Sequence, residues 1–398
     1  MVKPRLLTPV AALRFVVAFG IVSFFADMTY EGMRSIAGPY LAVLGASGTA
    51  VGFIAGVAEL LGFTLRLVSG SVADRSRLYW PITLTGYAVQ MAAVPALALT
   101  GNWMAAAVLI ILERVGKATR NPPRDVMLSQ AGEVIGHGWA FGLHEALDQA
   151  GATIGPLVAA FVFARHHEYP SAFAWLAVPA AITVVLVLSV RFRYPIAGQI
   201  EASNETASDD TAASARLPPA FWWYCGGAAL VAFGFADYTL ISYHFAVAKT
   251  MPGTWVPILY ALAMATAGIG SLAAGRWFDR RGLIVLIPAT LLVAWYAPAV
   301  FLGGMWVALG GTALWGLGMG IHETVMAAAI ARLVPVARRA RAYGIFTAVF
   351  GLAWFAGSAV LGALYDHSVA ITAGVAALAQ LCALVPIWMA VKLLRKAR

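Results

Sequence analysis

The sequence is a succession of long apolar segments, and this constrains its fold more than any other feature. A helix that crosses the hydrocarbon core of a bilayer needs about 20 mostly apolar residues. Because the connections are short, neighbouring helices should run antiparallel in a compact all-α membrane protein. Twelve segments are predicted to span the membrane: 11–42, 48–72, 80–100, 103–128, 138–164, 170–190, 219–247, 254–277, 282–302, 305–333, 340–364 and 369–391.

The composition excludes a soluble enzyme, a disordered chain and a disulfide scaffold. Of the 398 residues, 61% are hydrophobic and only 11% are charged, whereas soluble domains have about 25% charged residues. The two cysteines, Cys225 and Cys382, lie in separate apolar segments and form no CxxC pair. No cysteine metal site or redox pair is therefore predicted.

The basic residues predict the orientation of the chain in the membrane. Arg165 and Lys249 are the two expected on the side opposite the termini, while most other Lys and Arg residues lie on the side that the termini share. Cytoplasmic loops of membrane proteins carry an excess of Lys and Arg. Both termini are therefore predicted to be cytoplasmic. The net charge of +9 follows from this topology, and it requires no nucleic-acid partner.

An internal repeat divides the chain into two halves. Phe25-Ala26-Asp27 recurs as Phe235-Ala236-Asp237, and Gly155 recurs as Gly357 in the same order. Two six-helix bundles of the same sense, 1–191 and 219–398, are expected to be related by a pseudo-two-fold axis along the membrane normal. The polar stretch 192–218 is predicted to be a cytoplasmic linker.

A short charged motif also occurs once in each half. Glycine allows close approach of two helices, and an Asp at a cytoplasmic helix end can pair with an Arg across the bundle. Breaking such a pair could shift a conformational equilibrium, for which 1–3 kcal/mol is a typical coupling. The alternative is a solvated turn that only sets the topology. The candidate gate residues are Gly70, Asp74, Arg75 and Arg77, with Gly275, Asp279, Arg280 and Arg281 in the second copy.

These features resemble the major facilitator superfamily over the full length of the chain. The Gly70 and Gly275 motifs are similar to the family's signature between helices 2 and 3 and its second copy, and Arg114 is similar to its helix-4 arginine. Gly151-x-x-x-Gly155-Pro156 resembles the helix-5 motif typical of exporters, although Ala159 and Ala160 replace its closing glycines. Asp27-Met-Thr-Tyr-Glu31 resembles a prokaryotic subgroup of uncertain substrate, some of whose relatives are linked to metal resistance.

The resemblance implies an alternating-access transporter, expected as a monomer in a prokaryotic plasma membrane. In the family fold, helices 1, 4, 7 and 10 line the cavity. This places the following residues near the transport pathway: Asp27, Glu31, Arg34, Arg114, Asp237, His322 and Glu323. Asp148 and the neighbouring Glu145, on the fifth span, complete the candidate set.

The intramembrane carboxyl groups suggest the chemistry. Each costs about 2.5–3.5 kcal/mol at a helix centre on insertion scales, so the acids should face an aqueous cavity or pair with cations. Asp27, Glu31 and Arg34 share one helix face, as do Glu113, Lys117 and Arg120. A static salt bridge, such as Glu31–Arg34 or Glu113–Lys117, is the alternative to a proton carrier. The first candidates for a carrier are Asp27 and Glu31, followed by Asp148 and Asp237.

The predicted function is proton-coupled export of a small amphipathic or cationic organic compound. Tyr30, Tyr238, Tyr243 and Trp315 could contribute cation–π contacts. A divalent metal exporter is the alternative, with ligands such as His144, Asp148, His322 and His244. An intramembrane enzyme is less favoured, because His144-Glu145-Ala-Leu-Asp148 departs from the HExxH motif at its last position. No nucleotide motif lies in a suitable context, so no cofactor is expected.

Overall fold

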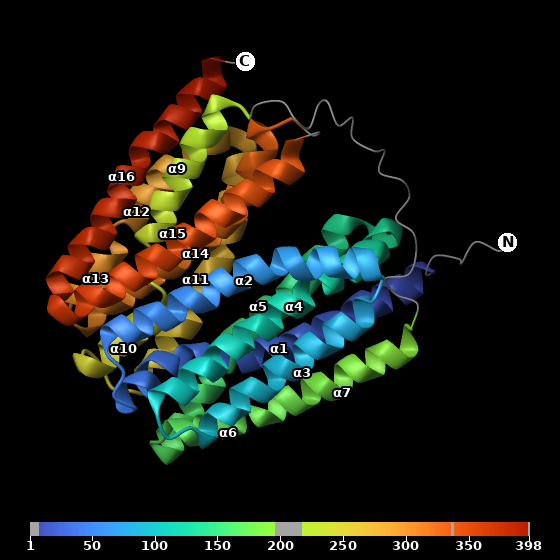
Figure 1. The fold of residues 1–398 in the computed structure, drawn as a ribbon, viewed down its shortest axis with the longest axis horizontal. Helices are drawn as coiled ribbons and strands as arrows, with labels where there is room; N and C mark the ends of the chain where they lie inside the picture. The colour runs from blue at the N-terminus through green and yellow to red at the C-terminus, as the bar shows by residue number, and fades with distance from the viewer. Residues whose placement is uncertain (1–7, 196–216, 336–337, 397–398) are drawn as a thin grey trace. The chain divides into compact units, whose positions relative to one another are not determined.

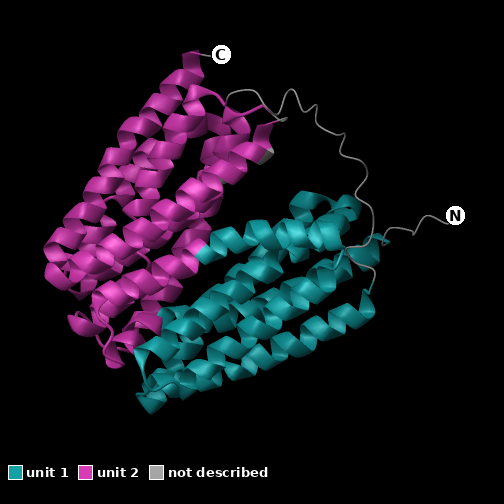
Figure 2. Ribbon diagram, in the orientation of Figure 1, with its two compact units in different colours: residues 1–36, 61–206 teal, residues 37–60, 207–398 magenta. Residues whose placement is uncertain are grey.

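The computed structural model describes residues 8–195, 217–335 and 338–396. Within these ranges every regular element is a helix (Figure 1). The chain divides into two compact units (Figure 2). Most of the predicted linker, residues 196–216, lies outside the described residues.

Unit 1 comprises Met1–Ile36 and Leu61–Thr206. Its apolar core includes Phe15, Phe19 and Tyr87. The helices of this unit are the first part of α1 (Pro9–Val43), the second part of α2 (Gly48–Ser76), α3 (Tyr79–Ala96), η1 (Leu97–Leu99), α4 (Trp103–Ile135), α5 (His137–His166), α6 (Tyr169–Trp175) and α7 (Ala177–Arg193).

Unit 2 comprises Ala37–Leu60 and Ala207–Arg398. Its core includes Phe221, Tyr224 and Leu286. Besides the end of α1 and the beginning of α2, this unit contains α9 (Pro219–Phe233), α10 (Tyr238–Val247), α11 (Trp255–Arg281), η2 (Gly282–Val285), α12 (Leu286–Val293), α13 (Tyr296–Leu302), α14 (Met305–Leu333), α15 (Arg339–His367) and α16 (Val369–Lys396).

Ten helical segments of the described chain are long and apolar enough to cross a membrane. The predicted spans 254–277 and 282–302 fall in one such segment, Trp255–Leu302. The predicted span 103–128 lies in α4, which is helical but is not among the ten. Its charged residues Glu113, Arg114, Lys117 and Arg120 explain this, because they lower its hydropathy.

The internal repeat has a counterpart in the contacts of each unit. In unit 1, Ser69 Oγ on α2 donates a hydrogen bond of 3.1 Å to the carbonyl oxygen of Ala118 on α4. In unit 2, Ser271 Oγ on α11 donates one of 3.0 Å to the carbonyl oxygen of Gly320 on α14. Donor and acceptor are 49 residues apart in both cases. The repeated sequences therefore form the same helix contact twice.

One predicted span, 219–247, is broken into α9 and α10 at residues 234–237. Side chains from other helices replace part of the helical hydrogen bonding at this break. The Tyr296 hydroxyl accepts from the Ala236 N–H at 2.6 Å and donates to the Gly234 carbonyl at 2.8 Å. Trp315 Nε1 donates to the Ala236 carbonyl at 2.9 Å. Such replacement partners allow a discontinuous helix at membrane depth.

The beginning of α2 is fixed to α15 within unit 2. Asp366 Oδ1 accepts the Gly48 N–H at 2.7 Å, and Asp366 Oδ2 accepts the Thr49 N–H at 2.8 Å. The Thr49 hydroxyl also donates to Asp366 Oδ2 at 2.6 Å. A helix N-terminus has unpaired N–H groups and a partial positive charge, so the Asp366 carboxylate acts as its cap.

Candidate functional site

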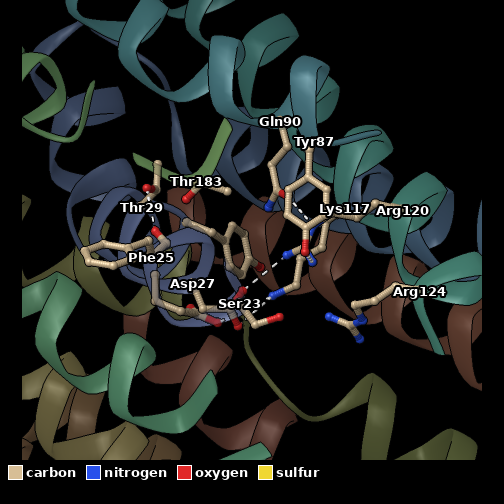
Figure 3. A network of polar contacts seen from close by, with 12 residues as sticks. Ser23, Phe25, Asp27, Thr29, Tyr87, Gln90, Lys117, Arg120, Arg124 and Thr183 are labelled. Atoms are coloured by element: carbon tan, nitrogen blue, oxygen red, sulfur yellow. Dashed lines mark hydrogen bonds and ion pairs between the residues drawn. The ribbon is translucent and has the colours of Figure 1, made fainter. Parts of the chain in front are cut away.

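Asp27 on α1 is paired with two cations of α4 (Figure 3). Asp27 Oδ1 is 3.3 Å from Arg120 Nη2, and Asp27 Oδ2 is 3.5 Å from Lys117 Nζ. Arg120 is 0% and Asp27 4% exposed. Because buried ions are costly unless they are paired and hydrogen-bonded, these contacts are what allow the three charged side chains to be inside the bundle.

Helix α3 holds the Arg120 guanidinium in place. Arg120 Nε donates a hydrogen bond of 2.6 Å to Gln90 Oε1, and Arg120 Nη1 donates one of 3.1 Å to the Tyr87 hydroxyl. The guanidinium carbon is also 4.4 Å from the centre of the Tyr87 ring. A Cβ atom at Gly86 or Gly116 would overlap the backbone of the facing helix. The close approach of α3 and α4 therefore requires glycine at these positions, and it brings Gln90 to Arg120.

Gln90, which holds Arg120, also binds Glu113, a carboxyl side chain that is 1% exposed on α4. Gln90 Nε2 donates a hydrogen bond of 2.7 Å to Glu113 Oε1. The sequence suggested a salt bridge between Glu113 and Lys117 as a static alternative. Instead, Lys117 Nζ reaches α1, where Glu31 Oε1 is 3.9 Å away in addition to Asp27. The amide of Gln90 thus links Glu113 to Arg120 and through it to Asp27.

Helix α5 contributes a second row of polar contacts to α1. Ser23 Oγ and His144 Nε2 are 2.8 Å apart, and Asp27 and Asp148 follow these two residues by one turn on their respective helices. Asp148 Oδ1 is buried without a hydrogen-bond partner among the described residues. A carboxylate only accepts hydrogen bonds. A hydrogen bond between Asp27 and Asp148 therefore requires a proton on one of them.

The predicted helix-5 motif explains how α1 and α5 come so close. A Cβ atom at Gly151 would overlap the carbonyl oxygen of Phe24, and one at Gly155 would overlap that of Met28. Pro156 follows within α5 and is buried. Gly357 in unit 2, the repeat counterpart of Gly155, makes the same kind of contact with the carbonyl oxygen of Phe233. These glycines position the α1 and α5 side chains by allowing the backbones to touch.

Three cations also surround Tyr30 on α1. Lys117 Nζ is 3.8 Å from the centre of the Tyr30 ring, and the guanidinium carbons of Arg114 and Arg34 are 5.4 and 6.0 Å from it. Both Arg114 and Arg34 donate hydrogen bonds to the Tyr30 hydroxyl. The structure thus brings together Asp27, Glu31, Arg34 and Arg114, which were predicted from the sequence.

Glu145 is placed differently from the other predicted residues of unit 1. It is exposed on α5, and its Oε1 accepts a hydrogen bond of 3.0 Å from Gln149 Nε2. Asp148 lies three residues further along the same helix, and its Oδ1 atom is buried. Glu145 therefore offers a natural control for experiments on Asp27 and Asp148.

The predicted residues Asp237, His322 and Glu323 belong to unit 2. Asp237 is the N-cap of α10, and its Oδ1 accepts hydrogen bonds from the N–H and hydroxyl of Thr239 at 2.8 and 2.7 Å. His322 is 5% exposed, and neither ring nitrogen has a hydrogen-bond partner among the described residues. Its ring packs edge-on against Phe235. Glu323 is exposed.

The gate motif residues lie at the ends of α2 and α11. Asp74 Oδ1 accepts a hydrogen bond of 3.1 Å from the Tyr79 hydroxyl. In the described residues no ion pair joins Asp74 to an arginine, and Arg75 and Arg77 are exposed. In the second copy, the Asp279 carbonyl accepts from Arg332 at 3.2 Å, while Arg280 and Arg281 are exposed. A Cβ atom at Gly70 or Gly275 would only touch α4 or α14, respectively.

Sequence reasoning did not assign the network residues Tyr87, Gln90 and Ser23. The signal for Gln90 was a polar side chain within an otherwise apolar span, and Tyr87 lies one helical turn nearer the N-terminus. Which cation they contact depends on the packing of α3 against α4, which the sequence alone does not specify.

Among the described residues, no group of three or more His, Cys, Asp or Glu side chains could hold a metal ion.

Long apolar helices that enclose a buried network of charges are typical of a multi-pass membrane transporter. The chain belongs to the Major Facilitator Superfamily, whose family model matches residues 19–358. It is therefore a secondary transporter rather than an enzyme, and proteins of this family handle small-molecule substrates.

One relative is similar over most of the chain and another over about a third of it. An uncharacterised protein of Mycobacterium tuberculosis is 41% identical over 380 residues, covering 94% of this chain and 92% of the relative. An uncharacterised MFS-type transporter of Methanocaldococcus jannaschii is 30% identical over 137 residues, or 34% of each chain.

Two solved structures show the similarity of the fold. The nucleoside transporter NupG superimposes with a TM-score of 0.73 at 14% identity, over 95% of this chain and 98% of that one. A peptide transporter POT in complex with sulfate superimposes with a TM-score of 0.77 at 16% identity, over 95% of this chain and 94% of that one.

Proposed function

We propose that this protein is a proton-coupled antiporter that exports a small amphipathic or cationic organic compound by alternating access. The proposal includes twelve membrane spans in two six-helix bundles, 1–191 and 219–398, joined by a cytoplasmic linker. It also includes a monomer in the plasma membrane of a prokaryote, with both termini in the cytoplasm. The distribution of Lys and Arg supports this orientation.

The observation that carries the proton coupling is the position of Asp27. Its carboxyl group contacts Lys117 and Arg120 of α4, and Asp148 follows His144 by one turn on α5 just as Asp27 follows Ser23 on α1. A proton on the Asp27–Asp148 pair and the positive charges of α4 compete for the same oxygens. Protonation would loosen the ion pairs between α1 and α4, and loss of the proton would tighten them.

This competition gives the protein a way to couple proton movement to a conformational change. An equilibrium shifts only by the difference in binding free energy between its two states. We propose that Asp27 and Asp148 share one transported proton, that the ion pairs of α4 respond to it, and that Asp74 and Asp279 take part in the cytoplasmic gate in another conformational state.

An organic cargo is favoured over a divalent metal ion. The histidines that the metal alternative requires are occupied otherwise or isolated in the described part: His144 contacts Ser23, and His244 Nδ1 is 3.0 Å from the Tyr365 hydroxyl. No cluster of metal-binding side chains forms there. Aromatic rings surround Phe235 in unit 2, including Tyr296, Trp315 and Trp354, and these suit an organic molecule.

Proteoliposomes with an imposed pH gradient test the proposal. Ethidium, an aromatic cation, serves as the organic probe, and Co²⁺ serves as the metal probe. Wild-type protein should move ethidium in response to the gradient, and Asp27→Asn and Asp148→Asn should abolish this response. Glu145→Gln, on the exposed face of the same α5 helix, should retain it.

Several outcomes would contradict the proposal. Undiminished proton-driven flux in Asp27→Asn and Asp148→Asn would remove the assigned carriers. Gradient-driven movement of Co²⁺ but not ethidium would favour the metal exporter. Labelling with dicyclohexylcarbodiimide, which attacks protonated carboxyl groups in apolar surroundings, provides a test without substrate, because Asp27 or Asp148 should be modified and Glu145 should not.

A further inference from the structure

The exposed face of α16 changes its chemistry along the helix. Leu378, Val385 and Trp388 are 60%, 65% and 51% exposed. Lys392 and Arg395 follow at spacings of four and three residues, so they continue the same stripe. The stripe therefore passes from aliphatic side chains to an indole and then to cations. Membrane proteins show this order where a helix leaves the acyl chains and enters the headgroup layer.

A pocket lies where this stripe becomes charged. It has a volume of about 240 Å³ and is lined by Ile284, Trp388, Val391, Lys392, Arg395 and Lys396. Lys392 Nζ is 5.2 Å from the centre of the Trp388 ring. Ile284 belongs to η2, the short segment that connects α11 to α12. The pocket thus combines apolar side chains from two elements with three cations from the last turns of α16.

The sequence around the pocket is strongly basic. Arg280 and Arg281 end α11 just before η2. Together with the cations at the end of α16, they outnumber the one neighbouring acid, Asp279. An anion is therefore the complementary ligand. A soluble anion would use the cations alone, whereas the pocket is continuous in sequence with the exposed apolar residues of α16. This continuity favours a ligand that has both a negative headgroup and an acyl chain.

We propose that this pocket binds an anionic phospholipid. The phosphate would interact with Lys392, Arg395 and Lys396, the glycerol region would lie against Trp388, and an acyl chain would follow Val385 and Leu378. Basic pockets between membrane helices on the cytoplasmic side are known to suit anionic lipid headgroups. The site is separate from the Asp27 network and does not depend on proton coupling or on the identity of the cargo.

Lipid binding to the full-length protein in neutral detergent tests this proposal. Binding is measured by native mass spectrometry and by thermal unfolding with added dioleoyl-phosphatidylglycerol, dioleoyl-phosphatidylcholine or inorganic phosphate. The wild-type protein should bind phosphatidylglycerol in preference to phosphatidylcholine. Replacing Lys392, Arg395 or Lys396 by Gln should weaken phosphatidylglycerol binding about fivefold for each cation removed.

A matched control is Arg193→Gln, which removes an exposed cation from the last turn of α7, outside the pocket. It should leave the affinity for phosphatidylglycerol close to that of the wild type. An equal loss in Arg193→Gln and Arg395→Gln would show general charge attraction and overturn the proposal. Unchanged binding in the Lys392, Arg395 and Lys396 variants would also overturn it, as would stabilisation by inorganic phosphate equal to that by phosphatidylglycerol.

Discussion

Asp27 Oδ1 on α1 lies 3.3 Å from Arg120 Nη2 on α4, and the Arg120 side chain has no exposed surface. This ion pair joins α1 to α4 in the interior of unit 1. Its partners on α3, Gln90 and Tyr87, leave the guanidinium little freedom to turn elsewhere. The ion pair therefore has consequences for stability as well as for transport.

Replacing Arg120 should be strongly destabilising. Arg120→Gln leaves Asp27 buried with one cation fewer, and breaking a buried pair in this way costs about 3–5 kcal/mol. Thermal unfolding of the purified protein measures the effect, and the double variant Asp27→Asn/Arg120→Gln should recover part of it. Arg193→Gln is the control, because Arg193 is exposed in the last turn of α7 and exposed charges contribute about 1 kcal/mol or less. Equal stability of Arg120→Gln and wild type would contradict the assignment.

Gly155 should not tolerate a side chain. In Gly155→Ala the new Cβ atom would meet the carbonyl oxygen of Met28, so α1 and α5 must separate. Overpacking of this kind costs about 1–3 kcal/mol, and proton-driven transport should fall because Asp27 and Asp148 move apart. Gly142→Ala on the same helix has open space around it and should be neutral or stabilising, because alanine favours helix. If both variants behave alike in unfolding and transport assays, the close contact is not needed.

Asp237 should act mainly through the beginning of α10. Asp237→Ala removes the cap and should cost about 0.5–2 kcal/mol, whereas Asp237→Asn can still accept the Thr239 hydrogen bonds and should remain close to wild type. Proton-driven transport should survive in Asp237→Asn but not in Asp27→Asn. Loss of transport in a well-folded Asp237→Asn protein would instead identify Asp237 as a proton carrier.

Asp366 should stabilise the contact between α2 and α15. Asp366→Ala leaves the N–H groups of Gly48 and Thr49 without their acceptor, and loss of a helix cap costs about 0.5–2 kcal/mol. Hydrogen exchange at Gly48 and Thr49 should accelerate. Asp366→Asn should retain most of the protection, since asparagine is also a good cap. Unchanged exchange in Asp366→Ala would mean that the cap contributes little in solution.

The sequence was sufficient for the class of fold because membrane helices must be long and apolar, and because the repeated motifs survive in both halves. It was less informative about how each charged residue is used. Asp27 and Asp237 occupy equivalent places in the repeat, yet Asp27 pairs with cations of α4 while Asp237 caps α10. The difference arises from the break at 234–237, which depends on Tyr296 and Trp315 on other helices. The pairing of Lys117 likewise depends on which face of α4 meets α1.

The break between α9 and α10 makes the two repeats mechanically unequal. Four residues, 234–237, connect α9 to α10, and side chains of other helices replace part of the helical hydrogen bonding there. Helix α1, its counterpart, passes through the equivalent position without interruption. Bending should therefore concentrate at a pivot next to Gly234, whereas the segment carrying Asp27 should tilt as a rigid rod.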